Sequence, residues 1–223
     1  GSQTRSNNVW WAPNATRSYG SLGSSLLNVD PKFKSKTDLH AESIACHNSG
    51  VAVSGVTKDI DGETRCPGTG CAGAASAPDR GADEYYLPNI DAAPKALVVP
   101  ASCPGVVTIK VRVENKGLLN LTSFSVKWSI AVNAGSASIK SPVSWSGTLK
   151  PGKDTLITLG NQTMAKGSQY HVEAITYSPN ATTDQKVSND TIGGTFETAM
   201  NGTYTVGGLT PDFTTIAAAA TAL

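Results

Sequence analysis

Between about Ala96 and Phe196, apolar and polar residues alternate along several short segments, and this alternation constrains the fold more than any other feature. Successive side chains of a strand point to opposite faces, so such a segment has one apolar face. The apolar positions are Val107, Ile109, Val111 and Val113 in the first segment, and Phe124, Val126, Trp128, Ile130 and Val132 in the second. Both patterns predict strands with one buried face.

Further alternating segments follow, separated by turn residues. Their apolar positions are Val143 and Trp145, then Thr155, Ile157 and Leu159, then Tyr170, Val172 and Ala174, with a last strand over 191–196. The turns are expected at 115–117 and 150–153, which hold Asn, Lys, Pro and Gly. Six or seven short strands in about 100 residues are typical of an immunoglobulin-like sandwich. We expect Trp128 and Trp145 to be buried in it.

The first 92 residues have a different texture. Apolar residues come in twos and threes and are followed by clusters of Asn, Gly, Ser and Pro, as in segments 7–14 and 26–33. In a β-solenoid each coil contributes a few inward residues and then turns, which gives this pattern. A loop-rich sandwich gives a similar one, so periodicity alone leaves both open.

The C-terminal residues predict a brief strand and then a helix. Tyr204 and Val206 form the strand, and the two glycines at 207–208 end it. Thr210 is a suitable N-cap, with proline and aspartate in the first turn. We expect a helix over 210–223 with one apolar face: Phe213, Ile216, Ala217, Ala220 and Leu223. That face has no partner in its own segment, so we expect the helix to belong to a further domain.

Composition narrows the classes of function. Charged residues make up 16% of the chain, against roughly 25% in an average soluble domain. A net charge of +1 with scattered basic residues gives no phosphate-binding surface, which argues against nucleic acid as a partner. The longest apolar stretch, 216–220, is far shorter than a membrane span. Residues 1–8 lack the features of a signal peptide, so we expect an internal piece of a longer secreted protein.

The cysteines favour an extracytoplasmic setting. Cys66 and Cys71 flank Pro-Gly-Thr-Gly, a turn that brings the two thiols together. A structural disulfide between them is favoured, with free thiols or a metal site as the alternatives. A disulfide implies an oxidising compartment. Cys46 and Cys103 could pair with each other, but spacing does not decide it.

Two other groups are candidate binding sites. Asp59, Asp61 and Glu63 have the spacing of oxygen ligands of a hard cation, and Asp83 and Glu84 could add to them. The alternative is a solvated turn whose carboxylates accept backbone hydrogen bonds and pair with Arg65, and we assign no metal. Trp10 and Trp11 resemble a sugar-stacking pair, although adjacent strand residues face opposite ways.

The chain offers little for catalysis. His40, His47 and His171 fall in unrelated segments, and neither Gly-x-Ser-x-Gly nor His-Glu-x-x-His occurs. We therefore predict no catalytic residue, no cofactor and no enzyme activity. Six Asn-x-Ser/Thr sequons occur, at Asn14, Asn120, Asn161, Asn180, Asn189 and Asn201. In a chain rich in Ser, Thr and Asn, most of these arise by chance.

Several motifs resemble those of very large secreted proteins of the Bacteroidota. Segments 30–33, 37–40, 59–65 and 79–85 are similar to the closing coils of right-handed parallel β-helices, and 8–11 to a tryptophan-containing coil before them. Segments 115–117, 145–152 and 189–191 resemble the CARDB-like adhesin module. Segments 202–208 and 211–213 are similar to the opening of another β-helix with its capping helix. Residues 66–71 depart from the pattern, because family members are shorter there.

The resemblance implies an all-β chain in three parts. Residues 1–92 would end a parallel β-helix, 93–197 would form the sandwich, and 198–223 would begin the next β-helix. The function implied is a structural repeat of an extracellular, cell-surface filament or adhesin exported by the type IX route, similar to the grappling-hook filaments of predatory marine gliding bacteria. Thr155 and Thr191 match an O-glycosylation pattern of such proteins.

The partners implied are identical chains in lateral contact, flanking repeats of the same chain, and cell-surface glycans of a host or prey. A carbohydrate-binding module with its own ligand site is the main alternative function. A remnant of a β-helix polysaccharide-active enzyme is the third. Binding of a glycan by the chain would distinguish the first alternative from a purely mechanical role.

Overall fold

A computed structural model describes residues 29–71, 76–100, 104–198 and 203–221, together with the backbone of two short strands, β1 (Val9–Trp10) and β2 (Leu26–Leu27). The chain forms two compact units, Gly1–Leu87 and Pro88–Leu223. Strands fill most of the second unit, whereas the described residues of the first are mostly turns, bends and irregular segments.

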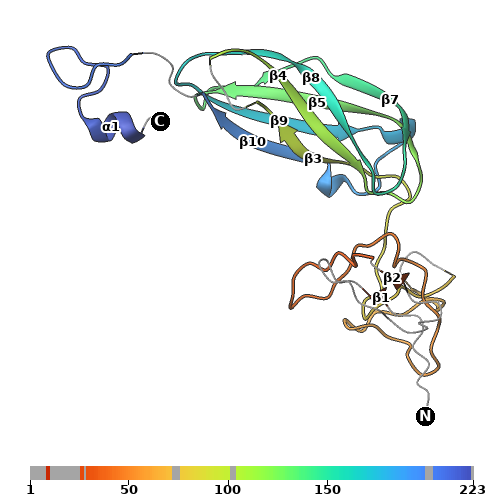
Figure 1. Cartoon of the computed structure of the whole chain (residues 1–223). Helices are drawn as coiled ribbons and strands as arrows, with labels where there is room; N and C mark the ends of the chain where they lie inside the picture. The colour runs from red at the N-terminus through yellow and green to blue at the C-terminus, as the bar shows by residue number, and fades with distance from the viewer. Residues whose placement is uncertain are drawn as a thin grey trace. The chain divides into compact units, whose positions relative to one another are not determined.

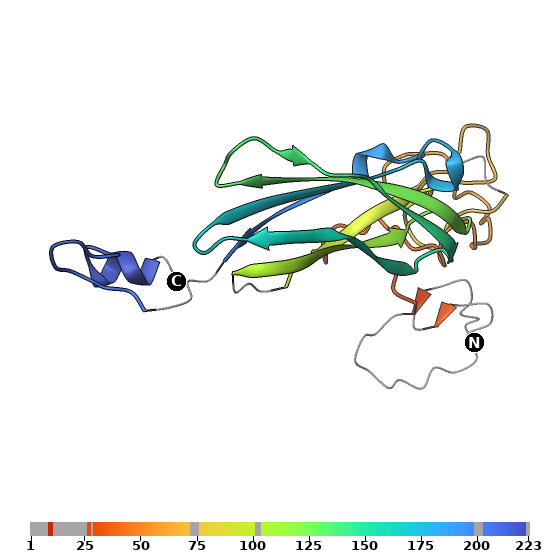
Figure 2. The ribbon, with the colours of Figure 1, turned by 90° about the horizontal axis from the view of Figure 1, so that it is seen from above.

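The second unit contains two antiparallel sheets (Figures 1 and 2). In the larger sheet β5 (Leu121–Val132) pairs on one side with β9 (Gln169–Tyr177), which in turn pairs with β10 (Thr191–Glu197). On its other side β5 pairs with β6 (Ser138–Ile139) and β7 (Val143–Leu149). In the smaller sheet β4 (Gly105–Asn115) lies between β3 (Ala92–Val98) and β8 (Asp154–Met164). Two 3₁₀ turns, η2 (Pro179–Ala181) and η3 (Val187–Asn189), connect β9 to β10.

The core lies between these sheets and follows the alternation of the sequence. Buried residues of β4 and β8 face buried residues of β5 and β9, and together they form one cluster: Ile109, Val111, Val113, Ile157, Leu159, Phe124, Val126, Trp128, Ile130, Tyr170, Val172 and Ala174. Burying such side chains supplies most of the stabilisation of a sandwich. The predicted antiparallel β-sandwich is confirmed.

The two sandwich tryptophans differ in burial. Trp128 is only 5% exposed, and its indole N–H donates to the carbonyl of Ser141 at 3.2 Å. Trp145 is half-buried and stacks on Phe124, with ring centroids 4.8 Å apart. The prediction is correct for Trp128. It is only partly correct for Trp145, because β7 is an edge strand with neighbours on one side only.

Two strands have no alternation and were not predicted. β3 begins at Ala92, before the alternating region, and contains Pro94 next to an irregularity in its register. Proline removes a ladder donor, which an edge strand tolerates. β6 has only two residues, both exposed, so no apolar pattern marks it.

Asn115 holds the two predicted turns together at one end of the sandwich. Its side-chain N–H₂ donates to the carbonyls of Leu119 and Leu149, both at 2.8 Å, and its side-chain oxygen accepts from Gly117 N at 2.9 Å. Its own carbonyl accepts from Gly152 N at 2.8 Å. Gly117 leaves no room for a Cβ, which would lie 2.5 Å from the carbonyl oxygen of Asn89. The turn glycine is therefore required by close backbone approach.

In the first unit β1 and β2 pair in parallel, Val9 with Leu26 and Trp10 with Leu27. Over 29–71 and 76–87 the structure shows no strand, only an antiparallel bridge between Lys58 and Thr64. The stacked coils of the predicted parallel β-helix are therefore not shown in these residues. Side-chain acceptors take the place of a ladder there, as described below.

The C-terminal helix is shorter than predicted. α1 spans Ile216–Thr221, and its cap is Thr215, whose hydroxyl oxygen accepts from Ala218 N at 3.1 Å. The predicted start at Thr210 is wrong because Asp212 is used elsewhere: its carboxylate accepts from both the N–H and the hydroxyl of Thr205, at 2.9 Å each. Residues 222 and 223 lie outside the described part. No helix in the described segments is long and apolar enough to cross a bilayer.

Truncating the core of the sandwich tests this arrangement. We expect Phe124→Ala to lower the free energy of unfolding by about 3–5 kcal/mol, because it removes a buried ring and leaves a cavity. Val106→Ala is the matched control, since Val106 is 70% exposed and its truncation should cost less than about 0.5 kcal/mol. Denaturant titration followed by tryptophan fluorescence measures both. Equal losses in the two variants would contradict the assigned strand faces.

Candidate functional site

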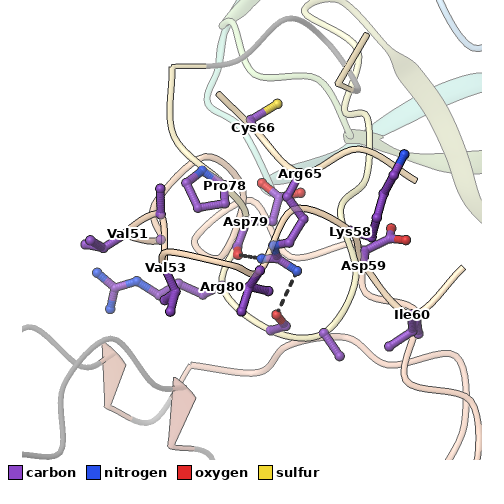
Figure 3. A pocket seen from close by; sticks show the side chains of 15 residues that line it. Val51, Val53, Lys58, Asp59, Ile60, Arg65, Cys66, Pro78, Asp79 and Arg80 are labelled. Carbon is purple, nitrogen blue, oxygen red and sulfur yellow. Dashed lines mark hydrogen bonds between the residues drawn. The ribbon is translucent and has the colours of Figure 1, made fainter. Parts of the chain in front are cut away.

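A pocket of about 630 Å³ opens in the first unit (Figure 3). Val51, Val53, Val56 and Ile60, all substantially exposed, contribute apolar side chains to its lining. Arg65 lies in it, and its guanidinium donates to the carbonyls of Asp79 at 2.5 Å and Gly81 at 3.2 Å. The charged group is therefore engaged with the chain itself.

Buried carboxylates of segment 79–84, of which Asp79 lines this pocket, hold the backbone of the first unit. Asp79 accepts from the N–H of Asn48 and, at 2.9 Å, from the N–H of Tyr85. Asp83 accepts from Ala41 N at 2.9 Å. The predicted coil motif at 79–85 thus ties itself to the segment 41–48, which no local pattern in the sequence indicates.

Glu84 and Tyr85 complete this network. Glu84 accepts from Asp79 N at 3.2 Å, and burial raises the pKa of its carboxyl. The Tyr85 hydroxyl donates to the carbonyl of Ser43 at 2.6 Å, and burial raises its pKa far above the ordinary value. A tyrosine held neutral in this way serves as a structural donor.

The candidate cation ligands Asp59, Asp61 and Glu63 do not converge on one point. One Asp59 oxygen accepts from Asp61 N at 2.9 Å and Glu63 N at 2.7 Å, and the other accepts from Glu84 N at 3.2 Å. Burial opposes ionisation of Asp59, yet these three N–H groups outweigh it and lower its pKa. The turn alternative considered for this segment therefore describes Asp59 better than a cation site does.

Asp61 contacts His40 instead. The His40 ring is bonded at Nδ1 to Asp38 and at Nε2 to Asp61, the latter at 2.6 Å. Hydrogen bonds to Asp38 and then to Asp61 raise the pKa of His40. One carboxylate oxygen of Asp83 lies within 4.8 Å of a ring nitrogen of His40 and an oxygen of Asp61. A ring that donates from both nitrogens has no lone pair for a metal, so the arrangement is that of an imidazolium bridging two carboxylates.

The cysteine turn is closed by a bond. Cys66 and Cys71 form a disulfide with their Cα atoms 5.2 Å apart. Cys46 is buried and forms no disulfide with another described residue, and burial raises the pKa of its thiol. Cys103 lies outside the described residues, as do Trp11 and the side chain of Trp10. The pairing of Cys46 and the sugar-stacking pair therefore stay predictions.

A second acidic cluster lies in the sandwich unit, and no sequence pattern predicted it. Asp91 precedes β3, Asp184 lies between η2 and η3, and Asp190 precedes β10. All three are buried, and they offer one carboxylate oxygen each within 4.8 Å of one another. Only the fold brings Asp91 to the other two, because more than 90 residues separate them in the chain.

No family model matches the sequence, and no curated protein does. Among solved structures, one similar chain is residues 272–376 of a protein from Methanosarcina acetivorans that is described as a cell surface protein. The two chains are 23% identical, with a TM-score of 0.37. The match covers 49% of this chain and 91% of that one. Another is a CARDB domain from Pyrococcus furiosus in complex with di-metal ions, with 16% identity, a TM-score of 0.36, and coverage of 51% and 90%. A third is a protein from Arabidopsis thaliana, with 16% identity, a TM-score of 0.32, and coverage of 53% and 87%. TM-scores below 0.5 do not establish a shared fold.

The role of Asp79 in the first unit is testable by amide exchange. We expect Asp79→Ala to abolish protection at the amides of Asn48 and Tyr85, because each amide would lose its acceptor. Asp30→Ala is the control, since exposed Asp30 accepts from Lys32 N at 2.8 Å where water can replace it. Unchanged exchange at Asn48 and Tyr85 in the Asp79 variant would refute this role.

Proposed function

We propose that this chain is a structural segment of an extracellular bacterial filament or adhesin, in which the sandwich acts as a rigid, immunoglobulin-like spacer and no reaction is catalysed. The observation that carries the proposal is the position of the two ends of the sandwich. The chain enters the sandwich at Ala92, beside one end of β9, and leaves it after Glu197, beside the other end of β9. A spacer that transmits tension in line needs this arrangement.

Hydrogen bonds fix both ends along β9. At the entry, the Thr176 hydroxyl donates to the carbonyl of Ala92. At the exit, Thr198 N donates to the carbonyl of Ser168 at 3.1 Å, and Glu197 pairs with Gln169. At about 3.4 Å per residue, the run from Gln169 to Thr176 separates the two ends by about 24 Å. Tension along the chain therefore passes through the length of the sandwich.

The pairing of the terminal strands suits such a load. β3 pairs with β4 in one sheet and β10 pairs with β9 in the other. Pulling the entry and the exit apart shears both ladders, so many hydrogen bonds are strained at once. Pulling on two points of the chain at the same end of the sandwich would instead open a single ladder, one hydrogen-bonded residue pair at a time.

Other features support the extracellular and filamentous parts of the proposal. The disulfide between Cys66 and Cys71 suits an oxidising compartment. The order of motifs along the sequence supports a β-helix end in 1–92 and the beginning of another β-helix after 198, in a surface protein of the Bacteroidota type. The carboxylates of 79–85 are engaged in holding the backbone, which suits a scaffold.

Single-molecule force spectroscopy on the whole chain tests the spacer. With handles at the two chain termini, we expect the sandwich to rupture in one event that lengthens the chain by about 340 Å, the contour released by residues 92–197. The control places one handle at the N-terminus and the other at residue 116, because Ala92 pairs with Asn115 and this pull unzips β3 from β4. The control should rupture at a clearly lower force. Equal forces in both geometries, or extension without a discrete event, would overturn the spacer role.

The proposal extends to lateral contacts between identical chains through the sandwich. Ile139 is 84% exposed and Val187 is 66% exposed, and the low charge density leaves few ionic groups to desolvate on association. We expect light scattering in physiological salt to show oligomers of the purified chain, and Ile139→Lys to weaken them by adding charge to the surface, whereas Lys95→Arg should not. A monomer at all concentrations would argue against lateral contacts. Binding of a defined polysaccharide in a glycan array would favour the carbohydrate-binding alternative.

A further inference from the structure

Three aspartates from distant parts of the chain converge at the entry end of the sandwich, and all three are almost fully buried. Asp91 is 1% exposed, Asp184 is 6% exposed and Asp190 is 7% exposed. One carboxylate oxygen of each lies within 4.8 Å of the others. Oxygens that bind one calcium ion lie about 2.3–2.6 Å from it. Two oxygens on opposite sides of the ion are therefore about twice that distance apart, which matches the separations in this cluster. One ion can therefore touch all three.

Three oxygens at this cluster lack hydrogen-bond donors. Asp91 Oδ1, Asn189 Oδ1 and Asp190 Oδ1 are buried, and none has a hydrogen-bond partner in the described part of the chain. All three are acceptors only, so a protein would have to place N–H or O–H groups against them to satisfy them. Buried acceptors without donors are rare in folded proteins, and a bound cation satisfies several at once.

The remaining contacts hold the cluster in place. Asp184 accepts from Ala92 N and Lys186 N, both at 2.8 Å, which fixes its carboxylate between β3 and the turn before β10. Asn189 Nδ2 donates to Asp91 Oδ2 at 3.0 Å, which leaves Asp91 Oδ1 unpaired. The ligand atoms are therefore preorganised by the backbone and by one another.

Burial makes the charged forms of the carboxyls in this cluster costly. Burial raises the pKa of Asp91 to about 6, despite the fields of Lys186 and Lys116. Burial, with the charges of Asp184 and Asp91, raises the pKa of Asp190 to about 7. Burial opposes ionisation of carboxyls, and charged carboxyls this close together repel one another. A divalent cation removes this penalty directly.

We propose that Asp91, Asp184 and Asp190 bind one calcium ion, with Asn189 Oδ1 as a fourth ligand. The donor set consists of oxygens alone, which suits a hard cation and not zinc, for which nitrogen and sulfur ligands are typical. Calcium fits better than magnesium because it accepts irregular geometry and six to eight oxygens. A pocket of about 430 Å³ lined by Asp184 and Asp190 gives water and the ion access to the site.

Bound calcium would link three segments at the end where the chain enters the sandwich. Asp91 directly precedes the first strand, and Asp190 directly precedes the last. The ion would therefore fix the start of β3 and the start of β10 to the loop that carries η2 and η3. This inference concerns the second unit alone and does not depend on the spacer role.

Calorimetry and thermal unfolding of the whole chain test the site. After treatment with a chelator and dialysis, we expect calcium to bind with a stoichiometry of one. At 10 mM, calcium should raise the midpoint of the sandwich transition by about 5–15 °C, for an affinity typical of extracellular modules. Magnesium at the same concentration should give a clearly smaller shift. Absence of calcium binding to the unaltered chain would overturn the site.

Two variants locate the ion. Asp190→Asn should abolish both the binding and the thermal shift. In the absence of calcium it should melt at or above the temperature of the unaltered chain, because a neutral amide relieves the buried charge. Asp61→Asn is the matched control, since Asp61 belongs to the other acidic group, with His40 and Asp83, and should leave binding unchanged. Binding that survives Asp190→Asn, or that is lost in Asp61→Asn alone, would place the ion elsewhere and refute the proposal.

Discussion

Backbone N–H groups that no strand ladder pairs need other acceptors, and this requirement shapes the described part of the first unit. Residues 29–71 and 76–87 have no strand ladder to supply acceptors. Carboxylates supply them instead. Asp59 serves the amides of its own turn, and Asp79 and Asp83 bind segments more than 30 residues away. A side chain that accepts two hydrogen bonds from N–H groups pairs the backbone of a turn, as a neighbouring strand pairs the backbone of a strand in a sheet. The acidic motifs of this unit therefore have a structural role.

The same principle operates in the sandwich wherever the ladders end. Asn115 uses its whole amide to join two turns, and Asn180 Oδ1 accepts from the N–H of Thr122 at 2.7 Å and from its hydroxyl at 3.1 Å. Asp184 serves the first amide of β3. The strands supply the apolar core, while these few polar side chains fix how the loops close over its ends. Replacing Asn115 or Asp184 leaves a buried donor without a partner, which costs more than the bond itself contributes.

What the sequence predicts follows from the range of the interactions. Alternation depends on nearest neighbours along one strand, so the strands that contain Val111 and Val126 were predicted with the correct buried face. β3 was missed because its partner across the ladder, and not its own pattern, makes it a strand. The helix start at Thr210 was wrong because Asp212 caps a loop at Thr205 instead of a helix. Coils of a β-helix were expected from motif resemblance, and in the described residues the only parallel pairing of strands is that of β1 with β2.

Candidate sites also depend on contacts between distant segments, which local sequence patterns do not contain. A comparison of two aspartates shows why. Asp59 and Asp190 are both acidic residues beside turns, but only Asp59 was a candidate cation ligand from the sequence, because close carboxylates flank it. In the structure Asp59 receives three N–H donors, and its pKa falls below the ordinary value even though burial acts against ionisation. Asp190 Oδ1 receives none, and its pKa rises to about 7.

Asp59 has little to gain from a metal, because backbone N–H groups already satisfy it, whereas Asp91 and Asp190 each have a buried oxygen without a donor. Local spacing of acidic residues reports neither state, because it contains no information about which N–H groups the fold will bring near. The distinction appears only when segments from 91 and from 184–190 meet at one end of the sandwich. For Asp59 and Asp190, the number of donors that face each buried oxygen separates the residue that builds the fold from the one that is available to bind an ion.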